Sequence, residues 1–272
     1  VSFSVQHQYL DDGLALGNNT ISDISTVSVT VADDDAQSGS NTTTVTVHNV
    51  APTVALNSVT DINENGTATL TGSYTDIGLL DAHTVTINWG DPNNGATSTF
   101  AVNAIQNAAG TATLHLNDTF SSSDGAVLTI TSINATTGQV GFSVQHQYLD
   151  DGLAPGNGTA SDVSTISVTV ADDDAQSGNK TTTVTVHNVT PSVALNSVTD
   201  INENGVATLE GSYTDIGLLD AHTLTINWGD PNNGTNSIFT INAIQNAGGA
   251  ATLHVNDTFN SADGAVLTIK SI

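Results

Sequence analysis

Acidic side chains concentrate in two short segments whose composition is typical of loops. Asp76 and Asp81 bracket a segment that contains Gly and Leu, and Asp172, Asp173 and Asp174 stand in a row after an alternating apolar run. Short carboxylate side chains in loops suit calcium, which takes about six to eight oxygen ligands in adjustable geometry. These residue types therefore predict a calcium site.

The acidic segments recur because the sequence repeats itself. Residues 1–133 align with residues 140–272 at a constant offset of 139 positions without a gap, and 109 of the 133 aligned residues are identical. Such self-similarity is the signature of a tandem array. We expect residues 1–50 to be the closing part of one repeat, residues 51–189 to be a complete repeat, and residues 190–272 to be the opening part of the next.

A turn around Glu64 adds a third acidic element. We expect this turn and the loop at residues 150–152 to lie at the end of the complete repeat that faces the next one, where Glu64 approaches Asp215 and Asp220 across the junction. The full set of predicted calcium ligands, with repeat counterparts, is Asp33, Asp34, Asp35, Glu64, Asp76, Asp81, Asp172, Asp173, Asp174, Glu203, Asp215 and Asp220.

An alternative interpretation gives these carboxylates no ion. Asp is common in turns because its side chain forms hydrogen bonds with the nearby backbone. Asp118 and Asp124 are assigned to that structural role. High acidity also keeps a surface protein of a halophilic or marine organism soluble.

The charge balance excludes several partners. The chain carries 27 acidic side chains against two lysines, Lys180 and Lys270, and its formal charge is −25. Nucleic acid and anionic membranes are therefore excluded as electrostatic partners. The chain has no Cys, which removes disulfides and thiolate metal sites and suits an extracellular location. No segment is long enough to span a membrane and the N-terminus lacks signal-peptide features, so any export signal or anchor is expected outside these residues.

The elements that must position the acidic loops are β-strands. Apolar residues alternate with Thr and Ser, and Gly, Asn and Asp separate the runs. We predict strands over residues 68–74, 83–89, 97–102, 112–116, 126–133, 140–148, 164–170 and 181–187, and no helix. Many short strands predict an all-β fold of tandem immunoglobulin-like β-sandwiches. In that topology the loop after the second strand, the loop before the last strand and the N-terminal link meet at one end, and here these loops are the acidic ones.

Four motifs carry a resemblance to a known family. VTINWGD at residues 85–91, HQYLDDG at 146–152, VTVADDD at 168–174 and NVTP at 188–191 together resemble a PKD repeat. The resemblance implies an extracellular immunoglobulin-like sandwich. Between Asp91 and Phe142 the chain departs from the family by an insertion that is expected to add two or three strands. This enlarged form is similar to repeats of very large bacterial surface proteins and adhesins.

The sequence predicts no catalytic site. It contains no nucleophile elbow, no phosphate-binding loop and no acid–base pair in an apolar setting, so we expect no enzyme activity. Its eight histidines lack the short spacings of a zinc motif. The alternation places His146 on the same face as Phe142, Val144 and Tyr148 and predicts a hydrogen-bonded core residue, whereas His115 and His187 point outward.

The sequence thus predicts a structural repeat of an extracellular surface protein, an adhesin stalk or a filament, rigidified by calcium where repeats meet. Its partners are expected to be neighbouring repeats of the same chain or identical chains. One alternative is an accessory module of a secreted enzyme that binds protein or glycans through Tyr74, Phe100 and Phe120. Another is a fibre subunit in which the opening strands of one chain complete the closing strands of the next.

Overall fold

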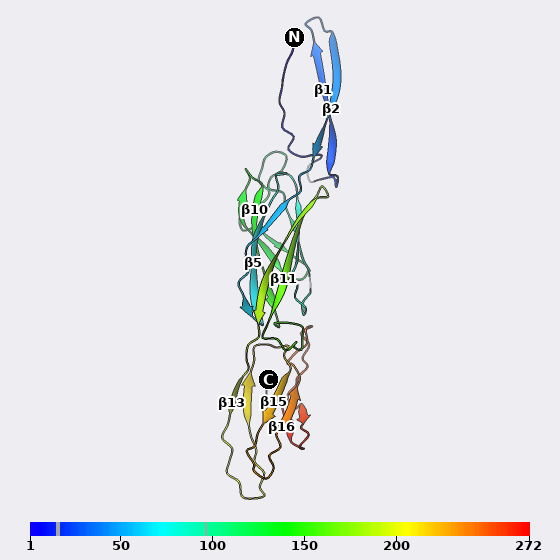
Figure 1. Cartoon of the computed structure of the whole chain (residues 1–272). Helices are drawn as coiled ribbons and strands as arrows, with labels where there is room; N and C mark the ends of the chain where they lie inside the picture. Colours follow the sequence, from blue (N-terminus) through cyan, green and yellow to red (C-terminus); the bar gives the residue numbers. More distant parts are fainter. Residues whose placement is uncertain (15–16, 96) are drawn as a thin grey trace.

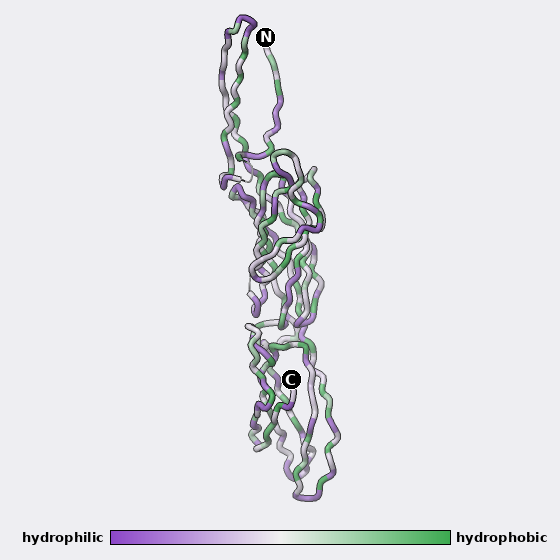
Figure 2. The backbone as a smooth tube through the Cα atoms, turned by 180° about the vertical axis from the view of Figure 1, so that it is seen from behind, coloured by the Kyte–Doolittle hydropathy of each residue, from purple (hydrophilic) through white to green (hydrophobic). Residues whose placement is uncertain are grey.

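The computed structural model describes residues 1–14, 17–95 and 97–272. Figure 1 shows three parts in line along one axis: an N-terminal hairpin, a central sandwich and a C-terminal part. The described residues form 18 β-strands and no helix. Figure 2 shows hydrophobic and hydrophilic residues mixed along the whole tube. No helix among the described residues is long and apolar enough to cross a membrane.

Two five-stranded sheets build the central sandwich. One sheet has the order β3 (Thr53–Leu56), β5 (Gly66–Thr75), β10 (Gln139–Tyr148), β9 (Val127–Asn134) and β8 (Thr119–Ser121). The other has the order β4 (Ile62–Asn63), β12 (Ser177–His187), β11 (Ser161–Asp172), β6 (His83–Asn88) and β7 (Thr97–Val102). Neighbours are antiparallel except β4 and β12, which are parallel. The first sheet has the A-B-E-D order of an immunoglobulin-like sandwich with β8 added at one edge, and the second has the G-F-C order with β4 and β7 added at its edges, as predicted.

Alternation along the strands places the core between the two sheets. In β11, Ile166, Val168 and Val170 are fully buried, while the residues between them carry hydroxyl groups. Trp89, at the end of β6, is 1% exposed, and its indole nitrogen donates a hydrogen bond to Ser98 at 2.9 Å. Because each strand contributes every second side chain, the polar residues are left for the outer faces.

The insertion contains β7, β8 and β9, but the strand expected at residues 112–116 is not formed. Ala112 makes only an isolated bridge with Gln106. The amides of Thr113 and Leu114 both donate to the carbonyl of Ile105, and the Thr113 hydroxyl donates to the Ala104 carbonyl at 2.6 Å. The segment therefore folds back on residues 104–107, which buries Leu114 without a strand ladder.

Each of the two outer parts contains strands that correspond in sequence to only some of the strands of the sandwich. The N-terminal part is the hairpin of β1 (Ser22–Ala32) and β2 (Ser38–His48). The C-terminal part pairs β13 (Ser192–Leu195) with β14 (Gly211–Thr214), β15 (His222–Ile226) with β16 (Ser237–Ile241), and β17 (Thr258–Asn260) with β18 (Val266–Thr268). Val27, Val29 and Val31 of β1 are exposed, whereas their counterparts in β11 are buried.

We expect the substitution Phe142→Ala to lower the free energy of unfolding by about 3–5 kcal/mol, because it empties a fully buried aromatic site. Phe3 occupies the same repeat position but is 70% exposed. Phe3→Ala is therefore the matched control, with an expected change below about 0.5 kcal/mol. Chemical unfolding of both variants measures the difference, and an equal loss would mean that Phe3 is covered in solution.

Candidate metal centres at the junctions between repeats

The acidic loops of the sandwich meet the N-terminal part at the upper junction. The β5–β6 loop, the β11–β12 turn and the link at residues 49–52 gather at this end (Figure 1). The amide of Asn18 donates to Asp174 Oδ1 at 2.7 Å, and the amide of Ala82 donates to Asp173 Oδ1 at 3.1 Å. The β11–β12 turn therefore contacts both the neighbouring part and the loop of its own sandwich.

Two groups of carboxylates lie at the upper junction. Oxygens of Asp81, Asp173 and Asp174 lie within 4.8 Å of one another, and so do oxygens of Asp11, Asp12 and Asp174. Asp174 is 1% exposed, Asp81 3% and Asp12 5%. Three oxygens at such spacings all reach a central calcium, whose bonds to oxygen are about 2.3–2.6 Å long.

A third group lies at the lower junction. Oxygens of Glu64, Asp150 and Asp220 lie within 4.8 Å of one another, with Glu64 fully buried. Glu64 Oε1 accepts a hydrogen bond from the amide of Val189 in the link at 2.5 Å. A side chain on Gly217 would overlap the Glu64 and Asp220 carboxylates. The glycine thus lets an acid of one repeat approach an acid of the next. The sequence predicted that Glu64 approaches both Asp215 and Asp220, and of these two only Asp220 belongs to the group.

Many of these oxygens lack a partner among the described residues. One buried oxygen without a hydrogen bond belongs to each of Asp11, Asp12, Glu64, Asp150, Asp151, Asp173 and Asp174. Buried polar groups are normally hydrogen-bonded, and a buried charge is costly unless it is paired or coordinates a metal. The junction carboxylates therefore require a proton or a cation.

Burial and mutual repulsion raise the pKa values of the junction carboxyls. Burial raises the pKa of Asp81 to about 8, and Asp76 adds to the shift. Burial also raises the pKa of Glu64 to about 7, with the Val189 amide acting against it and Asp220 adding to it. For Asp12 and Asp151 burial raises the pKa to about 6, with further repulsion from Asp174 and Asp150 respectively. Near neutral pH these sites therefore bind a proton or a cation readily.

Three predicted ligands already have both carboxylate oxygens hydrogen-bonded. Asp76 accepts from the Gly78 amide at 3.0 Å and contacts His83 Nε2 at 3.1 Å, and Asp215 repeats this pattern with Gly217 and His222. Asp172 accepts from the amides of Asp174 and Gln176 and from the Asn49 side chain. These acids fix the loops that carry the other carboxylates, and none of them belongs to the three groups.

Four other predicted ligands lie away from both junctions. Asp33, Asp34 and Asp35 are exposed in the β1–β2 turn, where Asp33 accepts from the amides of Asp35 and Gln37. Glu203 is exposed in the turn at the far end of the C-terminal part. Among the described residues, none of these four acids belongs to a group of carboxylates that could hold an ion.

Sequence reasoning missed three members of the three groups, Asp11, Asp12 and Asp150, and also the neighbouring Asp151, which has a buried oxygen without a partner. It placed residues 150–152 at the correct end of the repeat but did not count their carboxylates as ligands. The available signal was the pair of acids that follows β10 after Leu149 and precedes Gly152. That pair repeats at residues 11–12.

No family model matches the chain, and no curated protein matches it. The resemblance to PKD repeats therefore stays a prediction. A solved structure of BcpA, the major pilin subunit of Bacillus cereus, aligns with a TM-score of 0.30 and 9% identity over 89% of this chain and 70% of that one. The human Desmocollin-1 ectodomain aligns with a TM-score of 0.16 and 14% identity over 90% of this chain and 63% of that one. At these scores neither neighbour informs the function, and the fold assignment rests on the strand order.

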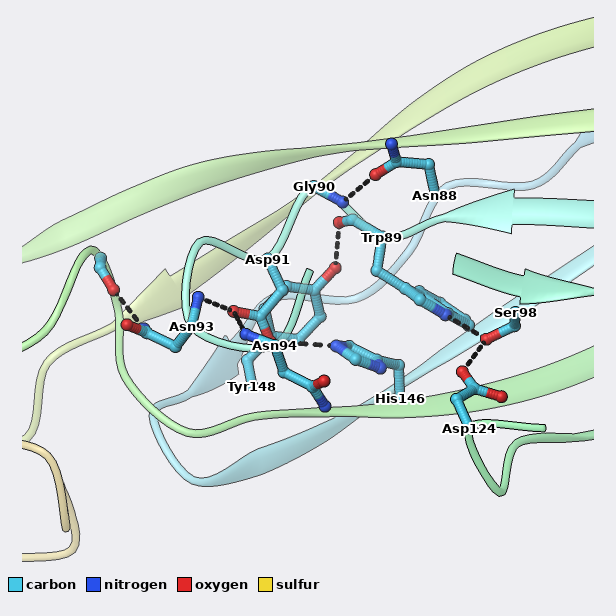
Figure 3. A network of polar contacts seen from close by, with 11 residues as sticks. Asn88, Trp89, Gly90, Asp91, Asn93, Asn94, Ser98, Asp124, His146 and Tyr148 are labelled. Atoms are coloured by element: carbon cyan, nitrogen blue, oxygen red, sulfur yellow. Dashed lines mark hydrogen bonds and ion pairs between the residues drawn. The ribbon is translucent and has the colours of Figure 1, made fainter. Parts of the chain in front are cut away.

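A polar network inside the sandwich supports the loop that carries Asp150 and Asp151 (Figure 3). His146 contacts Asp91 at 3.0 Å and stacks on Trp89 with ring centroids 4.8 Å apart, which confirms its predicted core role. The Tyr148 hydroxyl donates to the Trp89 carbonyl at 2.7 Å. These contacts join the end of β6 to the end of β10, where the acidic pair begins.

Asn93 extends this network into the loop itself. Its side-chain nitrogen donates to the Gly152 carbonyl at 2.5 Å, and its side-chain oxygen accepts from the Ala154 amide at 2.9 Å. Its own amide donates to Asp91 Oδ1 at 2.8 Å. Asn93 therefore fixes the backbone beside Asp150 and Asp151 relative to the rigid core.

We expect Asn93→Ala to lower the free energy of unfolding of the sandwich by about 1–3 kcal/mol, because two backbone partners lose their hydrogen bonds. Asn232 is the repeat counterpart, and its side chain makes no hydrogen bond in the described part of the chain. Asn232→Ala, the matched control, is expected to change stability by less than about 0.5 kcal/mol. An equal loss of stability in the two variants, measured by urea unfolding, would contradict the role of Asn93 in fixing the loop.

Stability in chelator is expected to fall as pH rises. The pKa of Asp81 is raised from 3.8 to about 8 and that of Glu64 from 4.5 to about 7, so the folded state binds these protons more tightly than the unfolded state. Their contribution is fully present below about pH 4 and is lost as pH rises through about 8. Thermal melts from about pH 5 to 8.5 test this. The double variant Asp81→Asn, Glu64→Gln should flatten the slope, and an unchanged slope would contradict the assignment.

Proposed function

We propose that this chain belongs to a tandem array of immunoglobulin-like sandwiches that acts as an extracellular stalk or filament and is stiffened by calcium at each junction. The proposed repeat spans residues 51–189, flanked by the closing part of one neighbour and the opening part of the next. In this role the useful property is length and rigidity. The proposal assigns the chain no catalysis.

One observation carries the proposal: the group of Glu64, Asp150 and Asp220 takes its members from two successive repeats. Glu64 and Asp150 belong to the sandwich, and Asp220 belongs to the part that follows. A cation at this place is bound by both repeats and fixes their relative orientation. Glu64 also holds the amide of Val189, so the same side chain restrains the link.

Electrostatics gives the cation a mechanical role. Without it, carboxylates of adjacent repeats repel one another across a few ångströms, and the repulsion is strong because they are shielded from water. With it, the repulsion becomes attraction and the link has less freedom to bend. Calcium fits better than magnesium, because calcium accepts an all-protein oxygen shell, whereas magnesium usually keeps several waters.

The alternative of glycan binding through aromatic residues is weakened by burial. Tyr74 is 2% exposed and Phe100 is fully buried, and Phe120 is partly buried against the same core. None of these side chains therefore offers the open aromatic face that stacking on a sugar needs. A binding role would require other residues.

The alternative of a strand-complemented fibre rests on the open apolar face of β1, beside Phe3. The buried counterparts of this face are covered by strands of the same repeat. Any continuing array therefore covers it in the same way, without a second chain. For the 272-residue chain, the comparison of Phe142→Ala with Phe3→Ala tests whether a second chain covers this face. An equal loss of stability in both variants would indicate that it is covered.

The proposal is tested by thermal melts and small-angle X-ray scattering in millimolar calcium and in excess chelator. Each occupied site is expected to stabilise the folded chain by about 2.7 kcal/mol when calcium is at a hundredfold excess over its dissociation constant. The scattering should show a stiff, elongated particle with calcium and a more flexible one without it.

Glu64→Gln and Glu203→Gln form a matched pair for this test. Both change the same repeat position, but Glu64 is buried at the lower junction and Glu203 is exposed. Glu64→Gln keeps the oxygen that accepts from Val189 and removes the charge, so the calcium-dependent gain should decrease. Glu203→Gln should leave the gain intact. Identical melts of the unmodified chain with calcium and with chelator would refute the proposal.

A further inference from the structure

Asp174 belongs to both carboxylate groups at the upper junction. On one side it meets Asp11 and Asp12 of the preceding part, and on the other it meets Asp81 and Asp173 of its own sandwich. Its Oδ1 accepts from the Asn18 amide, while its Oδ2 is buried and has no partner among the described residues. Asp174 is therefore placed as a bridge between two possible sites.

The five acids at the upper junction form two groups and not one. The five oxygens do not form a single group within 4.8 Å but divide into two groups of three that share Asp174. One ion in each group would give all five acids a role as ligands, with bonds to oxygen of about 2.3–2.6 Å. A single divalent cation would also leave three of the five negative charges uncompensated in a buried place, which is costly.

Independent evidence for ligands comes from the unpartnered oxygens. Asp12 and Asp174 are more than nine-tenths buried, and each directs an oxygen without a hydrogen-bond partner into the space between the loops. Asp11 and Asp173 each have a further unpartnered buried oxygen. Each of the two groups therefore contains buried carboxylate oxygens that have no hydrogen-bond partner and can bind a cation.

We infer that the upper junction holds two divalent cations bridged by the Asp174 carboxylate, and the lower junction one. This inference rests on the proposed calcium function. The first upper ion is held by Asp81, Asp173 and Asp174 within one sandwich. The second is held by Asp11, Asp12 and Asp174 and joins two repeats. The inner ion orients Asp174, so its binding prepares the site of the outer ion.

The repeat register extends the same pattern. Asp150 is the counterpart of Asp11, and Asp220 is the counterpart of Asp81. These two acids join Glu64 in the third group, at the lower junction. The same repeat positions therefore supply carboxylates to the groups at both junctions.

The stoichiometry is tested by native mass spectrometry and equilibrium dialysis of the full chain with calcium. Three ions are expected for the unmodified chain. Asp174→Asn should lose both upper ions and retain one, whereas Asp12→Asn and Asp220→Asn should each retain two. Asp35→Asn changes the repeat counterpart of Asp174 in an exposed turn and should retain all three.

The outcomes separate this inference from the proposed function. Two ions in the unmodified chain, with only one lost in Asp174→Asn, would overturn the bridged pair and leave a calcium-stiffened array. No bound calcium would overturn both. Energy transfer from terbium to europium gives a second measurement that does not depend on the folding of Asp174→Asn. Transfer between adjacent ions is expected in the unmodified chain and should be largely lost in Asp12→Asn, and its absence from the unmodified chain would contradict the bridge.

Discussion

Buried carboxylates without a protein counter-charge impose the main constraint on this molecule. A negative charge removed from water must be protonated, paired or bound to a cation. The chain has only two lysines, and Lys180 and Lys270 are both exposed. Neither belongs to a junction group, so compensation has to come from solution. In the proposed array, stiffness would therefore depend on the medium as well as on the fold.

The sandwich holds these charges together by giving its own loops a rigid base. Asp76 and Asp172 use their oxygens to shape the acidic loops at one end, and Asn93 fixes the acidic loop at the other. Strand alternation supplies the core from which all of these loops project. The loops therefore approach one another in fixed positions, and the repulsion between them cannot be relieved by a small movement of the backbone.

The strand pattern predicted most of the architecture, because a period of two residues directly determines which side chains are buried. It failed at residues 112–116, where hydrogen bonds to Ile105 and Ala104 replace pairing with a neighbouring strand. The approach of Glu64 to Asp220 followed from topology. The contributions of Asp11 and Asp12 did not, because they depend on how one repeat is rotated on the next. The spacing of the acids in the sequence also does not reveal that nearby amides donate hydrogen bonds to Asp76 and Asp172.

Each junction group that joins two repeats combines the end of one repeat with the beginning of the next, and the repeats differ at few positions. Recombination in register between copies this similar would add or remove whole repeats. Every new boundary formed in this way again has the end of one copy beside the beginning of another, with its ligand set intact. The number of repeats could therefore change while every boundary kept the same acidic residues.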